Sequence, residues 1–191
     1  MEGLLVLVAA YLIGSVSYAI LVASTQGIDI RTVGSGNPGV SNVLRTLGKK
    51  SAALVLVGDA LKGVIAAALG TYVVGDPFGW VALFVAMIGH AFPIWHGFRG
   101  GKSVATVLGG VVFLAPAVGG LLAVIWLVVV LVWKTASVAS LIVMVLLVPL
   151  IYVAEGAGAE LAWASLIAAF VIVRHAGNIR RLSSGREGTV A

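Results

Sequence analysis

Of the 191 residues, 61% are hydrophobic and only 10% are charged, whereas about a quarter of a typical soluble domain is charged. The absence of cysteine excludes disulfides and thiol catalysis, and the net charge of +5 does not indicate a nucleic-acid partner, because the lysines and arginines lie between apolar runs. The sequence therefore predicts an all-α, polytopic integral membrane protein that forms a single domain over residues 1–191.

Three apolar segments are expected to cross the membrane in the first half of the chain. The first is predicted to be a retained helix rather than a cleaved signal peptide, because Glu2 precedes it instead of a basic region and it is longer than a usual signal core. Gly14, Ser15 and Ser17 interrupt this segment. The expected spans are 3–23, 52–74 and 78–94, with a polar loop at 24–50 that has room for a short surface helix, and a turn at 75–77.

The apolar stretch 104–133 is too long for one ordinary span and contains Pro116, Gly119 and Gly120. If it is broken there, every lysine and arginine lies at or near one membrane face, which the positive-inside rule places in the cytoplasm. Two further spans are expected at 137–154 and 161–173. The sequence thus predicts a seven-helix bundle with its N-terminus outside and its C-terminus in the cytoplasm, in which each of the two middle helices is about 20 Å long.

Residues 34–45, GSGNPGVSNVLR, form a glycine-rich polar island in this apolar chain. Its three glycines permit backbone conformations in which successive N–H groups point into one concavity. Hydroxyls, amides and a guanidinium that suits phosphate lie among them. The pattern predicts an anion-binding loop, whose glycines are Gly34, Gly36 and Gly39 and whose donors are Ser35, Asn37, Ser41, Asn42 and Arg45.

A second polar island, residues 96–103, ends in Gly100, Gly101, Lys102 and Ser103. It is not a nucleotide-binding P-loop, because that motif requires glycine where His96 stands and follows a soluble strand rather than a membrane helix. The two glycines would still let the backbone approach an anion, and Lys102 would add a positive charge. Ser103 is expected to cap the helix that follows.

A third polar island, residues 174–181, follows the last span, and His175 and Asn178 share one face there. Ser140, three residues after Ser137, would face the same region if its helix lines the site. In the predicted topology the three polar islands converge at the cytoplasmic face. Phosphate-compatible donors are abundant in them and carboxylates are scarce, which favours anion binding.

Other polar residues have two interpretations. Asp59 and Lys62 lie three apart within a span and are expected to pair with each other or with a neighbouring helix. His90 is either a base or a hydrogen-bonded packing residue. No Ser-His-Asp set and no metal-ligand cluster is recognisable, so no metal or cofactor is expected, and a base would come from a histidine or from the substrate. The residues expected to be topology and lipid anchors are Arg31, Lys49, Lys50, Arg99 and Arg186.

Three motifs, GSGNPGVSNVLR, GHAFPIWHGFRGGKSVAT and RHAGNIRRL, resemble in order and spacing those of the bacterial acyl-phosphate:glycerol-3-phosphate acyltransferases. The likeness runs from Gly14 to about Glu187, although Ser41 stands where threonine is common and Ser103 where glycine is common. It implies an inner-membrane enzyme that transfers a fatty acyl group from acyl phosphate to the 1-hydroxyl of sn-glycerol 3-phosphate. The products would be lysophosphatidic acid and inorganic phosphate.

The resemblance also implies substrate assistance, in which a substrate phosphate accepts the hydroxyl proton, with His175 as the rival base. The implied partners are acyl phosphate, glycerol 3-phosphate and membrane lipid, with no obligatory protein partner. A transporter or flippase for a phosphorylated solute is the alternative, because it would need a similar anion site. The expected catalytic residues are Ser35, Arg45, Lys102, His175 and Asn178, and the expected substrate-binding residues are Gly34, Gly36, Asn37, Gly39, Ser41, Asn42, Gly100, Gly101, Ser103 and Ser140.

Overall fold

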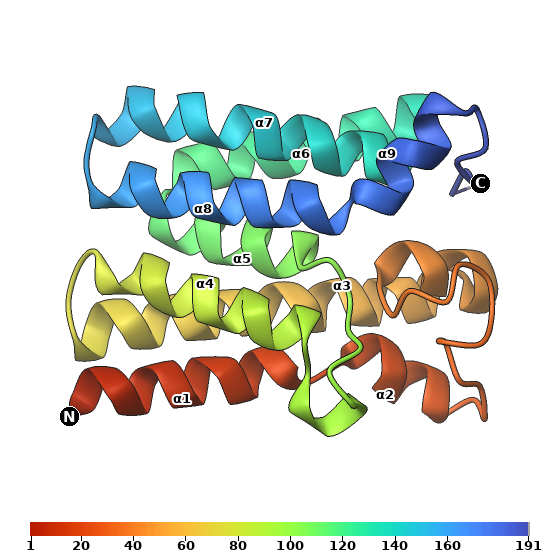
Figure 1. The fold of residues 1–191 in the computed structure, drawn as a ribbon, viewed down its shortest axis with the longest axis horizontal. Coiled ribbons are helices and arrows are strands. Elements are labelled where there is room, and N and C mark those ends of the chain that lie inside the picture. Colours follow the sequence, from red (N-terminus) through yellow and green to blue (C-terminus); the bar gives the residue numbers. More distant parts are fainter. Residues whose placement is uncertain (191) are drawn as a thin grey trace.

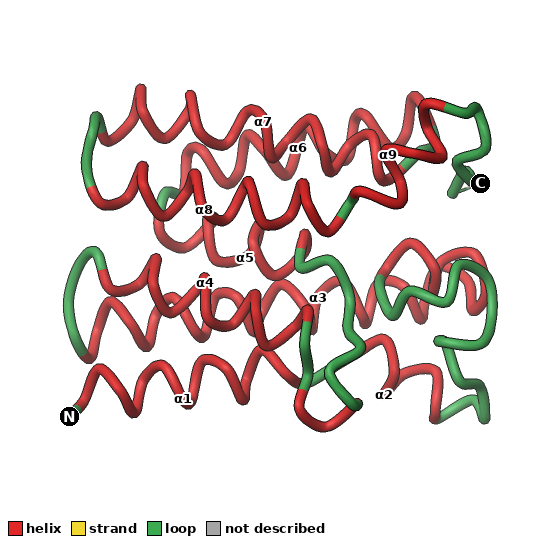
Figure 2. Tube along the Cα trace, viewed as in Figure 1, coloured by secondary structure: helices red, strands yellow, loops and turns green. Residues whose placement is uncertain are grey.

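The computed structural model describes residues 1–190, which form a bundle of α-helices without a strand in that range (Figures 1 and 2). The all-α prediction is therefore confirmed. The helices are α1 (Glu2–Ser15), α2 (Tyr18–Ser24), α3 (Val40–Val73), α4 (Phe78–Ala91), η1 (Ile94–His96), α5 (Val104–Leu114), α6 (Pro116–Trp133), α7 (Ala136–Glu155), α8 (Ala159–Arg174) and α9 (Ala176–Ser183), where η1 is a 3-10 helix.

Five helical segments are long and apolar enough to cross a membrane, namely α1 with α2, α3, α4 with η1, α6 and α7. The pair of α8 and α9, bent by 56°, gives a sixth, and α5 is a shorter apolar helix in the seventh predicted position. The predicted break is present, because α5 ends at Leu114 and Pro116 opens α6. The prediction of two short middle helices is wrong for α6, whose 18 residues span about 27 Å; only α5, with 11 residues, is short.

The polar loops gather at one end of the bundle. The loop before α3, the start of α7 and the C-terminal segment lie at the right in Figure 1, and the loop between α4 and α5 lies just right of the middle. The N-terminus and the turns that follow α3 and α7 lie at the opposite end. Because the three polar islands belong to the first group, the fold brings them together.

Glycines allow the central helices to approach closely. A Cβ at Gly63 would overlap the Thr106 carbonyl of α5, and one at Gly109 would overlap the Ala60 carbonyl of α3. Gly14 and Gly89 make the equivalent close contacts between α1 and α4. Small residues at helix crossings are typical of membrane bundles, where van der Waals packing replaces the hydrophobic effect. Many large apolar side chains on the outside, such as Leu131 and Val153, remain exposed, as expected for a lipid-facing surface.

Two helix breaks shape the polar end. Val16 and Ser17 have extended backbones and separate α1 from α2, which matches the predicted interruption of the first span. Within α3, Gly48 has a φ of 79°, so that residues 40–47 form a short helix set apart from the membrane-spanning part. This short helix is the surface helix for which the sequence had room, and its N-terminus lies beside the candidate site.

Candidate active site

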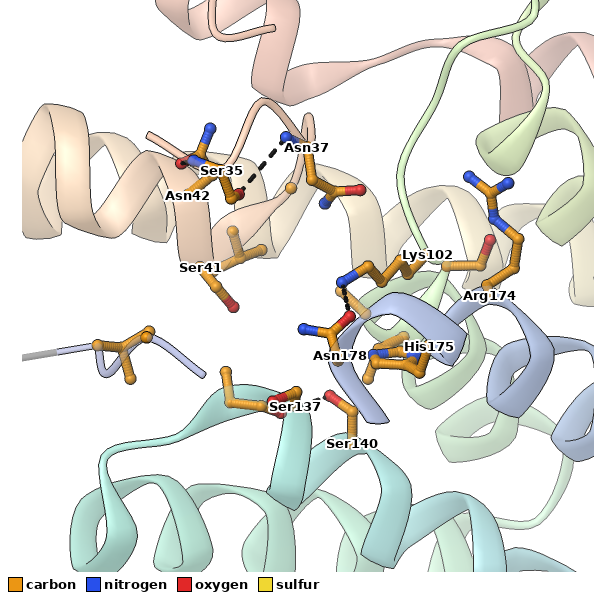
Figure 3. Close-up of a pocket in the computed structure, with 18 of the residues that line it drawn as sticks. Ser35, Asn37, Ser41, Asn42, Lys102, Ser137, Ser140, Arg174, His175 and Asn178 are labelled. Atoms are coloured by element: carbon orange, nitrogen blue, oxygen red, sulfur yellow. Dashed lines mark hydrogen bonds between the residues drawn. The ribbon is translucent and has the colours of Figure 1, made fainter. Parts of the chain in front are cut away.

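The three polar islands enclose one cavity of about 680 Å³, a size typical of small-molecule sites. Figure 3 shows donors from the loop before α3, the Lys102 loop, α7 and α9 surrounding a common space. The predicted convergence of the islands is therefore confirmed. The predicted residues that line the cavity are Gly34, Ser35, Asn37, Gly39, Ser41, Asn42, Arg45, Lys102, Ser103, Ser140, His175 and Asn178.

Asn42 holds the glycine-rich loop in shape. Its side chain is 1% exposed, its Nδ2 donates to the carbonyls of Ile30 (3.1 Å) and Val33 (3.0 Å), and its Oδ1 accepts from the Ser35 N–H (2.9 Å). A Cβ at Gly34, where φ is 59°, would overlap that oxygen. Since both polar atoms of the amide are occupied, the geometry favours loop support over substrate binding for Asn42.

Gly39 does not need the conformational freedom of glycine. Its φ of −156° is extended backbone that any residue adopts, and it occupies the N-cap position of α3. The expectation that all three glycines adopt conformations closed to other residues therefore holds for Gly34 and Gly36, with φ of 59° and 69°, and is wrong for Gly39. Gly36 lies outside the lining of the central cavity and borders a neighbouring surface hollow with Arg31 and Arg99.

Gly100 and Gly101 are not arranged to bind an anion directly. Neither lines the central cavity, and their N–H groups donate to the carbonyls of Ala91 (3.1 Å) and His90 (3.2 Å). Their own carbonyls accept from Arg174 Nη2, at 3.4 and 3.0 Å. The structure thus differs from the predicted substrate contact: these bonds fix the loop so that Lys102, the next residue, enters the cavity.

Ser103 does not cap α5 with its side chain, contrary to the prediction. Its Oγ donates to the Met87 carbonyl (2.9 Å), and its backbone has a φ of 66°. This left-handed conformation is one that glycine adopts without strain. It gives a physical reason for the resemblance to place glycine at this position.

Lys102 belongs to a network that includes a carboxylate missed in the sequence. Lys102 Nζ donates to Asn178 Oδ1, and Asn178 Nδ2 donates to Glu187 Oε1. Glu187 Oε1 also accepts from Ser137 Oγ (2.8 Å), and its Oε2 accepts from Arg181 Nε (2.7 Å). The C-terminal segment thus folds back over the cavity and holds the Asn178 amide in one orientation. Glu187 lies after the third polar island, so the scarcity of carboxylates in the islands stands, but the site receives a carboxylate from outside them. The only local signal for Glu187 was a single acidic residue after several arginines.

Burial lowers the pKa of two titratable groups that line the cavity. It lowers the pKa of Lys102 to about 8, although the charge of Glu187 acts in the opposite direction. Burial also lowers the pKa of His175 to about 4, so that its imidazole is neutral near pH 7. His175 Nδ1 lies 2.8 Å from the Val171 carbonyl oxygen, which can only accept a hydrogen bond. In the neutral imidazole the proton is therefore on Nδ1, and Nε2 is the acceptor.

Ser140 marks the border between the polar and apolar parts of the cavity. Its Oγ donates to the Ala136 carbonyl (2.7 Å) and accepts from Trp126 Nε1 (3.2 Å). The wall beyond it is apolar and comes from membrane-spanning helices, with Leu56, Leu108 and Trp126 in its lining. The cavity can therefore receive a molecule with an anionic end and an apolar end.

The cavity is electropositive for two reasons. Its lining has five cationic side chains, Arg45, Lys102, Arg174, Arg181 and Arg186, against two carboxylates. In addition, the N-terminal residues of α3, α5 and α7 border it, and helix N-termini present free N–H groups and a partial positive charge. Residues 1–190 contain no group of three or more His, Cys, Asp or Glu residues that could hold a metal. The arrangement is suited to binding phosphate groups.

The fold and the cavity together define a polytopic α-helical membrane protein with a phosphate-type pocket at one end of the bundle. The family model for glycerol-3-phosphate acyltransferase matches residues 4–185. A glycerol-3-phosphate acyltransferase of Neisseria meningitidis serogroup C (strain 053442) is 44% identical over 190 residues, which cover 95% of this chain and 94% of that protein. One from Rhizobium meliloti (strain 1021) is 40% identical over 185 residues, covering 96% and 90%. The chain belongs to the glycerol-3-phosphate acyltransferase family, which confirms the resemblance drawn from its motifs.

Two solved structures share the whole fold. Both are crystal structures of PlsY (YgiH), an integral membrane glycerol 3-phosphate acyltransferase. Its glycerol 3-phosphate form has a TM-score of 0.90 and 38% identity, covering 99% of this chain and 96% of that one. Its lysophosphatidic acid form has a TM-score of 0.87 and 37% identity, covering 99% and 95%. The multi-pass membrane architecture is thus shared from end to end.

Proposed function

We propose that this protein transfers a fatty acyl group from acyl phosphate to the 1-hydroxyl of sn-glycerol 3-phosphate, giving lysophosphatidic acid and inorganic phosphate, with its site at the cytoplasmic face of the bacterial inner membrane. The observation that carries the proposal is the cavity itself, which combines an excess of phosphate donors with an apolar wall. Both substrates have a phosphate, and only one has a long apolar chain. The family membership supports glycerol 3-phosphate as acceptor.

Each phosphate has its own group of donors in this proposal. The loop with Gly34, Ser35 and Asn37, at the N-terminus of α3, holds the phosphoryl group of acyl phosphate. Glycerol 3-phosphate is held by residues from four elements, which orient its 1-hydroxyl toward the carbonyl carbon. These residues are Arg45, Lys102, Ser140, His175 and Asn178.

The chemistry requires one bond to form and one to break. The 1-hydroxyl oxygen attacks the acyl carbonyl carbon, the bond from that carbon to the phosphate oxygen breaks, and the hydroxyl proton passes to a phosphate. Negative charge develops on the carbonyl oxygen and the leaving phosphate, where fixed N–H groups, Arg45 and Lys102 stabilise it. A phosphate with a second pKa near 6 is a better proton acceptor at neutral pH than His175, whose pKa is lowered to about 4.

The direct test uses purified protein, palmitoyl phosphate and glycerol 3-phosphate, with released phosphate and lysophosphatidic acid both measured. We expect the two products in equal amounts, and none with palmitoyl-CoA as donor. Failure to form lysophosphatidic acid from palmitoyl phosphate would refute the proposal. Uptake of labelled glycerol 3-phosphate into proteoliposomes without acyl transfer would instead favour a transporter.

The proton acceptor is tested with His175→Ala. If a substrate phosphate is the base, the variant loses rate through weaker binding, while the acidic limb of its pH–rate profile keeps the position found in the parent enzyme. Loss of that limb in the variant would show that His175 is the base.

A further inference from the structure

Asp59, Lys62 and His90 form an ionisable cluster within the membrane-spanning helices. Their exposed fractions are 2%, 2% and 7%, so all three are removed from solvent and lipid. Lys62 Nζ lies 2.9 Å from Asp59 Oδ1, and His90 Nδ1 lies 3.6 Å from the same oxygen. The pairing of Asp59 with Lys62 was predicted, whereas the contact of His90 with the pair was not. The proposed chemistry uses none of the three residues.

The cluster joins several helices. Lys62 Nζ donates to the Val16 carbonyl (2.8 Å), which is free because the first span is broken there. Thr106 Oγ1, in the first turn of α5, lies 3.4 Å from His90 Nδ1. The cluster therefore connects the break between α1 and α2, the middle of α3, the end of α4 and the start of α5.

His90 is also the residue on which the Lys102 loop rests. The His90 carbonyl accepts the Gly101 N–H (3.2 Å), and a Cβ at Gly101 would overlap His90 Nε2. The same Cβ would approach the Pro38 carbonyl of the glycine-rich loop to 2.9 Å. The edge of the His90 imidazole thus lies against the backbone of Gly101, the residue that directly precedes Lys102. The glycine-rich loop lies close to the same position. Both Asp59 and His90 are also among the residues that line the cavity.

We propose that His90, oriented by Asp59 and Thr106, is a positioning residue that sets the depth at which the Lys102 loop, and with it the Lys102 ammonium, enters the cavity. A carboxylate beside Nδ1 favours the tautomer with its proton on that nitrogen, which fixes the ring and leaves the Nε2 edge toward Gly101. Charged groups inside a membrane bundle are costly, and apolar residues of similar size would fill the same space more cheaply. Holding a catalytic loop at a fixed depth is a reason to keep this arrangement.

The inference rests on the proposed function, so the parent enzyme is assayed first. His90→Asn keeps an amide nitrogen near the Nδ1 position but removes the ring edge that faces Gly101, while His90→Gln keeps a distal polar atom. We expect His90→Asn to lower kcat/KM for glycerol 3-phosphate by about 10- to 100-fold, mainly through KM, with less effect on the KM of acyl phosphate. His90→Gln should retain more activity. The matched control is His96→Gln, a half-exposed histidine outside the cluster, which should behave as the parent does.

A double-mutant comparison separates positioning from mere support of the fold. Gly101→Ala should impair the parent strongly because its Cβ meets the imidazole, and should impair His90→Asn less because the ring is gone. If the two changes multiply, or if the folded His90 variants keep parental kinetic constants and differ only in thermal stability, the inference is overturned. If His90→Asn does not fold, the same comparison with His90→Gln decides. An inactive parent would refute the proposed function rather than this inference.

Discussion

The bundle contains two polar regions of opposite design. In the cluster of Asp59, Lys62 and His90, one carboxylate balances one ammonium, and every group is enclosed by helices. In the cavity beside it, five cationic side chains and three helix N-termini face open space, and Glu187 is the one lining carboxylate in the described part of the chain that does not belong to the cluster. Charged side chains therefore have different functions in the two regions. Compensated charges fix geometry, whereas uncompensated charges attract an anion, and the cavity depends on the cluster for the placement of its lysine.

Removing a charge from the cavity should cause the largest effect. Lys102→Ala is expected to lower kcat/KM by about a thousandfold without unfolding the protein, because the donor to the phosphates is lost while its loop keeps its backbone bonds. Arg45→Ala should behave similarly. Turnover and the unfolding temperature in detergent are measured together, with the exposed Lys49→Ala as control. Near-normal activity of either site variant would contradict the assignment.

Removing a charge from the cluster should instead affect stability. Asp59→Asn leaves Lys62 without a counter-charge in a buried position, which is expected to cost about 3–5 kcal/mol. Thermal unfolding in detergent should therefore occur at a markedly lower temperature. Adding Lys62→Met to the same protein should restore much of the loss, since no unpaired charge remains. If Asp59→Asn alone unfolds at the same temperature as the parent protein, the Asp59 carboxylate does not compensate the charge of Lys62 as the structure indicates.

The pH dependence sharpens the contrast, because the Lys102 ammonium is in the open cavity and has no salt bridge within residues 1–190. The pKa of Lys102 is lowered to about 8, so its ammonium is present below that pH and is lost above it. The kcat/KM for glycerol 3-phosphate should therefore fall as pH rises past about 8. Below neutrality it should fall again as the substrate phosphate, with a second pKa near 6, takes up a proton. A flat profile between pH 8 and pH 9 would be inconsistent with Lys102 as the titrating donor.

The smallest effect should come from neutralising Glu187. Because its carboxylate raises the pKa of Lys102 against the effect of burial, Glu187→Gln should move the alkaline limb of that profile to lower pH. Burial lowers the pKa of Lys102, and so do the positive charges of Arg45, Arg174 and Arg181. The charge of Glu187 opposes all of these effects. Glu155→Gln, at the opposite end of the bundle, is the control. A shift of the alkaline limb to higher pH would contradict the inference that the Glu187 carboxylate stabilises the Lys102 ammonium.

Much of the fold follows from hydropathy and charge placement. Apolar runs located the spans, and the asymmetry of lysine and arginine favoured the break that occurs at Ala115. The unequal lengths of α5 and α6 could not be predicted. They depend on how the chain packs against the neighbouring helices on either side of the break before Pro116. The site islands were predictable for a similar reason: loops on the same face of one helical bundle must share an end.

The finer features of the site depend on contacts between residues that are distant in sequence. Gly101 was expected to face an anion, but its N–H group is used by His90 at the end of another helix. The position of Glu187 depends on Ser137, 50 residues earlier, and on Asn178. Glycine content and local charge indicate which loops bind anions, but they do not indicate which backbone groups are already occupied.

The helix N-termini of α3, α5 and α7 give the cavity a property that side chains cannot supply. Each terminus carries roughly half an elementary charge, so that three together supply about one and a half, comparable to the charge of about −1.5 to −2 on a phosphate near pH 7. Peptide dipoles do not titrate. The cavity therefore has a permanent baseline attraction for phosphate, and the lysine and arginines tune selectivity and rate above it.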